Sequence, residues 1–251
     1  MLLGATTGLT RTALIAHPES SLEPDAEAGF LALAARRRAG EPIAYLLGER
    51  EFYGIALRVT SDVLIPRPET ELLVDFALER LPAGGTVLDL GTGSGAIALA
   101  IRHERPDARV TAVDRSEAAL AVARANAAHL RLDVEFVQGS WFDTLSGRRF
   151  DLVLSNPPYI AEDDPHLSEG DVRFEPRGAL VGGKDGLDAI RNIVATAPGH
   201  LRPGGWLAVE HGQWQDVAIR NLFEIAAFES VSSRPDLAGI ARISIGKYNP
   251  E

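Results

Sequence analysis

Short apolar runs alternate with helical segments from residue 86 to residue 228, and this order restricts the fold more than any other feature of the chain. Strands are expected at 86–90, 108–114, 134–138, 150–156 and 204–212, with helices at 94–103, 116–130, 187–201 and 215–228. Strands that alternate with helices form parallel sheets. The continuous apolar run at 152–154 is typical of a strand covered on both faces. We therefore expect a doubly wound α/β domain from about residue 61 onward.

A different pattern precedes that domain. The Ala- and Leu-rich run at 25–39 predicts a helix with Asp25 as its N-cap and Gly40 as its stop. Short β-type pieces at 45–59, interrupted by glycines, indicate a hairpin. We expect three parts: a helical domain at 1–44 that is too small for a large core of its own, a hairpin connector at 45–60, and the α/β domain at 61–251.

Composition excludes several classes of function. The chain of 251 residues carries 25 basic and 35 acidic side chains, a formal net charge of −10, so we expect neither direct nucleic-acid binding nor membrane binding. No apolar run reaches the roughly 20 residues that span a bilayer, and the first residues lack signal-peptide features, which predicts a cytoplasmic protein. Without cysteine, and with six scattered histidines, no metal site is expected.

A glycine loop follows the first expected strand of the α/β domain. Gly91, Gly93 and Gly95 stand between that strand and the opening of a helix. Glycines let the backbone turn tightly and approach a ligand, and the helix N-terminus offers unpaired N–H groups. Asp114 ends the next strand, where a carboxylate can accept hydrogen bonds from both hydroxyls of a ribose. These features together predict a cofactor that contains adenosine.

Two cofactors compete for this loop. The spacing from Gly91 through Gly93 to Ala96 satisfies the dinucleotide pattern G-x-G-x-x-G/A. The longer form D-x-G-x-G-x-G, which begins at Asp89, resembles the first motif of S-adenosylmethionine-dependent methyltransferases, in which the acidic residue holds the methionine end of the cofactor. A tight turn without a ligand is the third interpretation.

The motif Asn156-Pro157-Pro158-Tyr159 follows the apolar strand FDLVLS. The two prolines remove N–H donors, so the loop presents carbonyl acceptors. The side-chain carbonyl of Asn156 and a proline carbonyl can together accept both hydrogens of a planar NH₂ group. This arrangement would aim the nitrogen lone pair at a methyl donor without a strong base, with Tyr159 stacked on the substrate. The alternative is a proline-rich turn that ends a strand.

The two motifs together resemble those of the amino-methyltransferases, and further stretches narrow the resemblance. The stretches at 36–54, 63–74, 155–160, 175–191 and 201–215 resemble the signature of the release factor glutamine methyltransferase family (HemK/PrmC-like). The resemblance covers most of residues 10–246. Members of that family usually begin about one helix pair earlier, so this sequence resembles them from the middle of their N-terminal domain onward.

This resemblance implies a fold and a reaction. The fold is a Rossmann-like, seven-stranded class I methyltransferase sheet, preceded by a small helical domain that recognises the substrate and by a β-hairpin connector. The reaction transfers a methyl group from S-adenosyl-L-methionine to the glutamine of the Gly-Gly-Gln motif in class 1 peptide chain release factors, and leaves S-adenosyl-L-homocysteine. The implied cofactor-binding residues are Asp89, Gly91, Thr92, Gly93, Ser94, Gly95, Asp114, Trp141 and Asn156. The implied catalytic and substrate-binding residues are Asn156, Pro157, Pro158 and Tyr159.

Some interpretations stay open at this stage. The Asn-Pro-Pro-Tyr loop would equally serve a methyltransferase of adenine or another nucleic-acid amine, although residues 61–251 carry 19 basic and 28 acidic side chains, a balance of −9. A non-enzymatic adenosine-binding module is another class. Trp141 can also be interpreted as a core aromatic residue, and Arg36-Arg37-Arg38 can be interpreted as a solvated helix end. The segment 65–71 gives no atomic role for Arg67, Glu69 or Thr70, although the last two fit helix-start chemistry.

Overall fold

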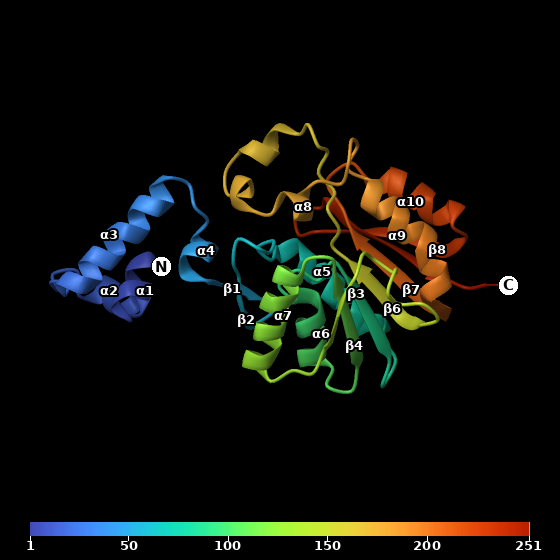
Figure 1. The fold of residues 1–251 in the computed structure, drawn as a ribbon, viewed down its shortest axis with the longest axis horizontal. Coiled ribbons are helices and arrows are strands. Elements are labelled where there is room, and N and C mark those ends of the chain that lie inside the picture. The colour runs from blue at the N-terminus through green and yellow to red at the C-terminus, as the bar shows by residue number, and fades with distance from the viewer. Residues whose placement is uncertain (251) are drawn as a thin grey trace.

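A seven-stranded sheet forms the centre of the molecule, as a computed structural model that describes residues 1–250 shows (Figure 1). The strand order is β5-β4-β3-β6-β7-β9-β8. The strands are β3 (Thr86–Leu90), β4 (Arg109–Asp114), β5 (Glu135–Gln138), β6 (Phe150–Ser155), β7 (Leu201–Glu210), β8 (Phe228–Pro235) and β9 (Ala241–Tyr248). The first five are parallel, and β9 runs antiparallel to both of its neighbours. The doubly wound α/β fold is therefore confirmed.

Helices cover both faces of this sheet. They are α5 (Glu71–Arg80), α6 (Ala96–Glu104), α7 (Glu117–Leu130), α9 (Asp188–Thr196) and α10 (Asp216–Ile225). The short helix α8 (Arg177–Leu180) lies in the connection between β6 and β7. Leu152 and Leu154 of β6 pack with α5 and α6, whereas Val153 packs with α9 and α10. Successive side chains of a strand point to opposite faces, so the apolar run at 152–154 contributes to two cores. This confirms the expectation of a strand covered on both faces.

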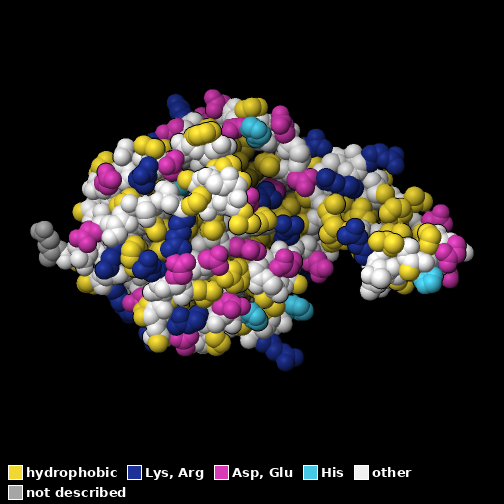
Figure 2. All heavy atoms as spheres, turned by 180° about the vertical axis from the view of Figure 1, so that it is seen from behind, with side chains coloured by type: hydrophobic (Ala, Val, Ile, Leu, Met, Phe, Trp, Pro, Cys, Tyr) yellow, Lys and Arg dark blue, Asp and Glu magenta, His cyan; other side chains and the backbone are white. Residues whose placement is uncertain are grey.

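Four helices and a hairpin precede the sheet. The helices are α1 (Leu2–Thr7), α2 (Arg11–Ala16), α3 (Pro24–Arg38) and α4 (Ile43–Leu47), and the hairpin strands are β1 (Glu49–Phe52) and β2 (Ile55–Arg58). The first three helices contain no buried residue and project away from the sheet (Figure 1). Figure 2 shows hydrophobic side chains on the surface of these helices, where Ile15 and Leu31 are exposed. We call residues 1–47 the N-terminal module.

The expected N-cap of the long helix in this module is wrong. Glu23 is the N-cap of α3, and Pro24 takes the first helical position. Proline is favoured there because its missing N–H would have no partner in the helix. Asp25 lies in the first turn instead, where its negative charge interacts favourably with the helix dipole.

The arginines at the end of α3 are only partly a solvated helix end. Arg36 forms an ion pair with Glu41 in its own module. Arg37 reaches Asp171, with Nη1 2.7 Å from Oδ1, in the long connection between β6 and β7. That connection contains the 3₁₀ turns η2 (Pro165–Ser168) and η3 (Val172–Phe174). The N-terminal module therefore contacts the part of the chain that follows the Asn-Pro-Pro-Tyr motif.

The C-terminal third differs most from the expectation drawn from strand and helix alternation. The helix expected at 187–201 ends at Thr196 and continues as the 3₁₀ turn η4 (Ala197–His200), because Pro198 cannot continue the α-helical hydrogen bonds. The strand expected at 204–212 starts three residues earlier, at Leu201. The alternation pattern missed β8 and β9, which form an antiparallel pair rather than alternating with helices. None of the helices in residues 1–250 combines the length and apolar character needed to cross a bilayer.

Asn126 in α7 joins the hairpin to the glycine loop. It is buried, its Oδ1 accepts the Arg58 N–H at 2.8 Å, and its Nδ2 donates to the carbonyls of Arg58 and Ser94. Removing this amide takes a hydrogen-bond partner from three backbone groups, of which the bond to the Ser94 carbonyl is buried. We expect Asn126→Ala to lower the free energy of unfolding by about 2–4 kcal/mol in urea titrations.

The exposed residue Asn221 of α10 provides the matched control. Asn221→Ala should change the free energy of unfolding by less than about 0.5 kcal/mol. Equal stability of the two variants would show that the Asn126 amide does not join these elements.

Candidate active site

The glycine loop between β3 and α6 is held by hydrogen bonds to the neighbouring strand. The N–H groups of Gly91 and Thr92 both donate to the carbonyl of Val113, at 2.8 and 3.0 Å. The N–H of Gly93 donates to Asp114 Oδ2 at 2.9 Å. Gly91, Gly93 and Gly95 have φ values of 72°, 57° and 86°, a region that other residues enter only with strain. The loop therefore needs its three glycines for backbone conformation.

Asp89, in β3, holds the glycine loop and the start of α6 through hydrogen bonds. Its side chain is fully buried, and Oδ2 accepts hydrogen bonds from the Thr92 hydroxyl at 2.6 Å and from the Ala98 N–H at 3.2 Å. Burial raises the pKa of Asp89 to about 7, although the hydrogen bonds from Thr92 and Ala98 oppose the shift. Its Oδ1 has no partner among residues 1–250. One carboxylate oxygen thus fixes the loop, and the other has no hydrogen-bond partner among residues 1–250.

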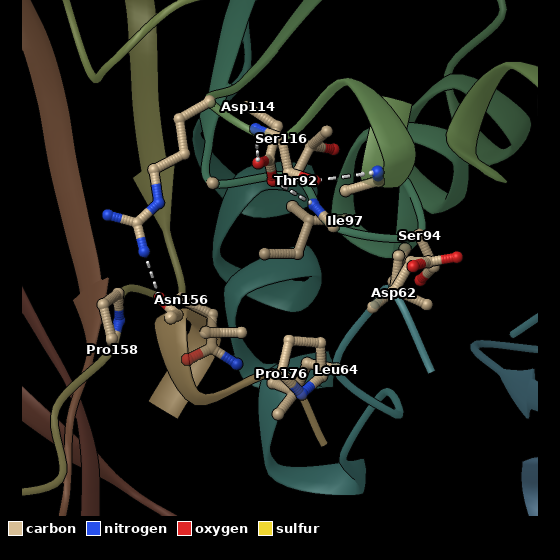
Figure 3. Close-up of a pocket in the computed structure, with 18 of the residues that line it drawn as sticks. Asp62, Leu64, Thr92, Ser94, Ile97, Asp114, Ser116, Asn156, Pro158 and Pro176 are labelled. Atoms are coloured by element: carbon tan, nitrogen blue, oxygen red, sulfur yellow. Dashed lines mark hydrogen bonds between the residues drawn. The ribbon is translucent and has the colours of Figure 1, made fainter. Parts of the chain in front are cut away.

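Asp114 ends β4 beside the loop. Its Oδ2 accepts the Gly93 N–H, and its Oδ1 accepts the Ser116 N–H at 2.9 Å. Each carboxylate oxygen can accept more than one hydrogen bond, so both retain capacity for a ligand. The carboxylate is held on two sides and lies next to the opening of the loop (Figure 3).

These groups line a cavity of about 300 Å³ above the sheet edge (Figure 3). Of the residues that the sequence predicts for the site, eight line the cavity: Gly91, Thr92, Gly93, Ser94, Asp114, Trp141, Asn156 and Pro158. The other four, Asp89, Gly95, Pro157 and Tyr159, do not line it. The two predicted motifs therefore meet at one cavity.

Several cavity residues were not predicted from the sequence. They are Asp62, Val63, Leu64, Pro66, Thr70, Ala96, Ile97, Arg115, Ser116, Ala119, Gly139, Ser140, Pro176, Gly178 and Ala179. The segment at 62–66 comes from the chain before α5, and Tyr45 of the N-terminal module holds it, since its hydroxyl donates to the Val63 carbonyl at 2.7 Å. The family-like stretches at 63–74 and 175–191 were the only signals that pointed to these segments.

Trp141 forms part of the cavity wall beside the glycine loop. Its φ of 50° is rare for an aromatic residue, which marks a constrained backbone. A Cβ atom on Gly91 would lie 3.5 Å from Cζ3 of Trp141, so the indole lies directly against the loop. It also packs against the core on the α9 and α10 face. Trp141 therefore belongs both to the cavity wall and to the edge of the core.

Asn156 lies where β6 ends, opposite the glycine loop. Its Nδ2 donates to the hydroxyl of Thr70 at 3.0 Å. The side-chain amide has one carbonyl and one NH₂ group, so Oδ1 remains as an acceptor at the cavity. Thr70 is buried at the start of α5, and its contact with Asn156 supplies the role that the sequence did not give.

The rest of the Asn-Pro-Pro-Tyr loop is fixed by backbone packing. The carbonyl of Tyr159 accepts Gln215 Nε2 at 3.0 Å. A Cβ atom on Gly186 would lie 2.2 Å from the same carbonyl oxygen, and one on Gly182 would lie 2.4 Å from the Pro158 carbonyl oxygen. Only glycine allows such close approach, so the stretch VGGKDG is a structural partner of the motif.

The segment 175–179, which runs into α8, lines the cavity on the side of the β6–β7 connection. Glu175 Oε1 and Arg67 Nη2 form an ion pair of 2.6 Å, and the Glu175 side chain is buried. Burial raises the pKa of Glu175, although the Arg67 charge opposes this shift. Arg115, which follows Asp114, donates to the Gly178 carbonyl at 2.9 Å. Arg67 and Arg115 therefore tie this segment to both sides of the cavity.

The fold and the composition of this site define a class I methyltransferase. A methyltransferase small domain matches residues 68–169, and a PrmC N-terminal domain matches residues 1–48. A methyltransferase structure from Pyrococcus furiosus, which is 20% identical, superposes with a TM-score of 0.62 over 86% of this chain and 98% of that one, and this likeness concerns the fold.

More similar relatives narrow the class to a family. A release factor glutamine methyltransferase from Burkholderia pseudomallei is 55% identical over 98% of this chain and 90% of its own length. One from Bordetella pertussis is 53% identical over 98% of this chain and 92% of its own length. The chain belongs to the release factor glutamine methyltransferase family, as the resemblance of its motifs predicted.

The contact between Gly186 and Tyr159 can be tested by substitution. Gly186 has a φ of 76°, so Gly186→Ala combines backbone strain with a collision against the Tyr159 carbonyl. We expect a loss of about 2–4 kcal/mol in the free energy of unfolding, measured by urea denaturation.

Gly84 provides the matched control, because its φ is 65° and a Cβ atom added to it would meet no other atom within 4 Å. Gly84→Ala should cost only the backbone strain, about 1–2 kcal/mol. If both variants lose the same stability, the close approach at Gly186 is not a constraint on the loop.

Proposed function

We propose that this chain transfers a methyl group from S-adenosyl-L-methionine to the side-chain amide nitrogen of a glutamine in a peptide chain release factor. The observation that carries the proposal is the orientation of Asn156. Its NH₂ group is engaged by Thr70, which leaves the carbonyl oxygen as an acceptor at a cavity that begins at the glycine loop. A free carbonyl at this position suits a substrate that brings N–H donors.

The donor set around the glycine loop fits the proposed cofactor. Asp114 offers two carboxylate oxygens for a pair of ribose hydroxyls, and the N-terminus of α6 favours a carboxylate. Trp141 and Ile97 provide apolar surface for an adenine. Asp89 does not line the cavity, so it would support the cofactor site by holding Thr92 and Ala98 in place. When bound, the cofactor supplies an electrophilic methyl group on a sulfonium.

Residues of the Asn-Pro-Pro-Tyr loop would act on the acceptor. Asn156 Oδ1 accepts one N–H of the glutamine amide, and a carbonyl of the proline pair accepts the other. The amide nitrogen has a delocalised lone pair, so orientation toward the methyl carbon supplies much of the rate. Nitrogen forms the new bond to carbon as the carbon–sulfur bond breaks, and the bonding electrons remain on sulfur. One amide proton then leaves to water, which restores a neutral amide.

Positive charge develops on the amide nitrogen during this transfer. Its N–H groups then become stronger donors, so the hydrogen bond to Asn156 strengthens in the transition state. Tyr159 does not line the cavity, and its hydroxyl donates to Glu210 Oε1 at 3.2 Å. This contact favours a role of Tyr159 in holding the Asn-Pro-Pro-Tyr loop over a role in stacking on the substrate.

The N-terminal module would recognise the protein substrate. Its first three helices bury none of their residues, and Leu9, Ile15 and Leu31 are exposed. Exposed apolar surface of this kind is typical of interaction sites. Class 1 release factors that carry Gly-Gly-Gln are the substrates implied by the family, and such a reaction would take place in the cytoplasm. The division expected from the sequence, into a recognition domain at 1–44, a connector at 45–60 and a catalytic domain at 61–251, is part of this proposal.

A nucleic-acid amine is the second candidate substrate, because the same loop would orient an adenine NH₂ group. The net charge of −10 argues against it. Incubation with labelled cofactor and either release factor, tRNA or DNA separates the candidates. We expect mass spectrometry to find one added methyl group on the glutamine of the release factor. Labelled nucleic acid with unmodified release factor would contradict the proposal.

The role of Asp114 is tested by cofactor affinity. Asp114→Ala removes the proposed hydrogen bonds to the ribose, which are worth about 1.5–3 kcal/mol when one partner is charged. We expect S-adenosylmethionine to bind roughly 10- to 150-fold more weakly in isothermal titration calorimetry. Asp133→Ala, at an exposed position outside the cavity, is the control and should bind normally. Unchanged affinity in the Asp114 variant would remove this residue from the cofactor site.

The role of Asn156 is tested by the rate of the chemical step. Asn156→Ala should lower the single-turnover rate of methylation by roughly 30- to 1,000-fold at saturating cofactor, a loss of about 2–4 kcal/mol. Cofactor affinity should change little, because the amide is proposed to act on the acceptor. Asn192→Ala, at an exposed position of α9, is the matched control. A near-normal rate in the Asn156 variant would contradict the orienting role.

A further inference from the structure

Trp214 is a large apolar side chain that neither the core nor the mechanism above uses. It lies in the turn between β7 and α10, and it is 85% exposed. Its φ of 72° is in the left-handed region, and the third position of a turn with this φ usually holds glycine or asparagine. Burial does not compensate this backbone strain, because the indole contacts little of the chain. A strained residue outside the core is an indicator of function.

The turn that holds Trp214 has a rigid base. Across it, the Gln215 N–H donates to the Gly212 carbonyl at 3.4 Å, and Gln215 Oε1 accepts the Gly212 N–H at 2.9 Å. Before it, the buried His211 donates its backbone N–H to the Arg242 carbonyl of β9 at 2.9 Å. The exposed indole therefore projects from a fixed backbone, which lowers the entropy cost of binding a partner.

The same turn is attached to the Asn-Pro-Pro-Tyr loop. Gln215 Nε2 donates to the Tyr159 carbonyl at 3.0 Å. A Cβ atom on Gly212 would lie 3.5 Å from Cδ2 of the Tyr159 ring, so the two segments lie against each other. Trp214 therefore keeps a fixed position relative to the loop on which the acceptor glutamine is proposed to bind.

The turn also lies close to Asn156. β6 and β7 pair in register up to Ser155 and Val209, so the two chains are still adjacent where Asn156 and Glu210 follow. The four-residue step from Glu210 to Trp214 spans at most about 14 Å. Trp214 does not line the cofactor cavity. It is therefore beside the acceptor loop and outside the space proposed for the cofactor.

A second exposed apolar side chain follows closely. Val217, in the first turn of α10, is 57% exposed. Outside the N-terminal module, four large hydrophobic side chains are exposed among residues 1–250, and two of them are Trp214 and Val217. The other two, Ile225 and Leu237, lie at the far end of α10 and between β8 and β9. We call Trp214 and Val217 the Trp214 patch.

Resting on the proposed function, we propose that the Trp214 patch contacts the protein that carries the acceptor glutamine, with Trp214 as the anchor. A glutamine side chain is small, so contacts with the surrounding protein have to supply binding energy and orientation. The helix α10 and the helices α1 to α3 lie at opposite ends of the molecule (Figure 1). Contacts at both places fix the acceptor protein over the site, whereas the N-terminal module alone leaves it free to rotate.

The chemistry of the Trp214 patch fits a protein surface better than a nucleic acid. An exposed indole can stack on a base, but a nucleic acid also needs basic side chains for its phosphates. The one charged residue between Trp214 and Val217 is acidic, and the chain carries a net charge of −10. Tryptophan is enriched among the residues that dominate protein–protein binding. The partner is therefore an apolar or backbone surface beside the acceptor glutamine of the release factor.

The first test separates binding from chemistry. Trp214→Ala removes the indole, so we expect the KM for intact release factor to rise roughly 10- to 100-fold, with kcat and cofactor affinity unchanged. Trp214→Phe keeps an aromatic ring and should recover most of the affinity. Ile225→Ala is the matched control, because Ile225 is an exposed apolar residue at the other end of the same helix. An unchanged KM in Trp214→Ala, or an equal rise in Ile225→Ala, would overturn the proposal.

A stability measurement tests whether the indole serves the fold instead. Trp214→Gly relieves the positive φ, so its unfolding midpoint in urea should equal or exceed that of the wild type. The KM for release factor should rise as it does in Trp214→Ala. A lower midpoint would show that the indole stabilises the fold, which contradicts a side chain kept for binding.

A spectroscopic measurement follows the contact without activity. In protein labelled with 5-fluorotryptophan, the ¹⁹F resonance of Trp214 is identified by its loss in Trp214→Phe. Unlabelled release factor should shift this resonance and reduce its response to D₂O, because the ring becomes buried. Trp206, identified in the same way, is the internal control, since its ring packs against Phe76 and Arg80 and should not respond. An unchanged Trp214 resonance at saturating release factor would contradict the contact.

Other occupants of the Trp214 patch give different spectra. A Trp214 resonance that shifts with protein concentration alone indicates a second copy of this chain, and one that shifts with tRNA but not with release factor indicates a nucleic acid. Either result overturns the proposal. If wild-type protein does not methylate glutamine while release factor buries Trp214, the proposed function fails and the contact stands. If methylation occurs and Trp214 stays exposed, only the contact fails.

Discussion

Parallel pairing of β4, β3 and β6 is the constraint on which the site depends. Because these strands run in one direction, their carboxyl ends lie at the same edge of the sheet. In this register Leu90 of β3 lies between Val113 and Ser155, so the glycine loop and the Asn-Pro-Pro-Tyr loop start from adjacent strands. The strand order therefore sets the position of the cavity, and the two loops set its shape.

Shaping that edge requires polar groups that bind protein before they bind a ligand. Asp114 holds Gly93 and Ser116, and Asp89 holds Thr92 and Ala98. Burial of Asp89 disfavours its charged form, so placing this carboxyl group under the glycine loop costs stability. In return its hydrogen bonds make this edge of the sheet rigid. A site held in this way needs little reorganisation when substrate binds, which is the condition under which fixed dipoles accelerate a reaction.

Local patterns in the sequence were sufficient for the parallel part of the fold and for the two loops. Periodicity located β3 to β7, and glycine and proline, whose conformational limits are local, located the loops. Periodicity did not locate β8 and β9, because two consecutive strands interrupt the alternation of strand and helix. The N-cap at Asp25 was wrong because Pro24 fits the first helical position better than it fits a cap.

Contacts between distant residues are the part that the sequence could not give. Thr70 and Asn156 are separated by 86 residues, and Tyr159 and Glu210 by 51, so no spacing rule connects them. A motif such as Asn-Pro-Pro-Tyr specifies which atoms can meet a substrate, but an Asn amide presents a donor and an acceptor equally well. In this fold the Asn156 amide donates to the hydroxyl of Thr70, which precedes α5. A contact from outside the loop therefore leaves the amide oxygen as the acceptor that the loop presents.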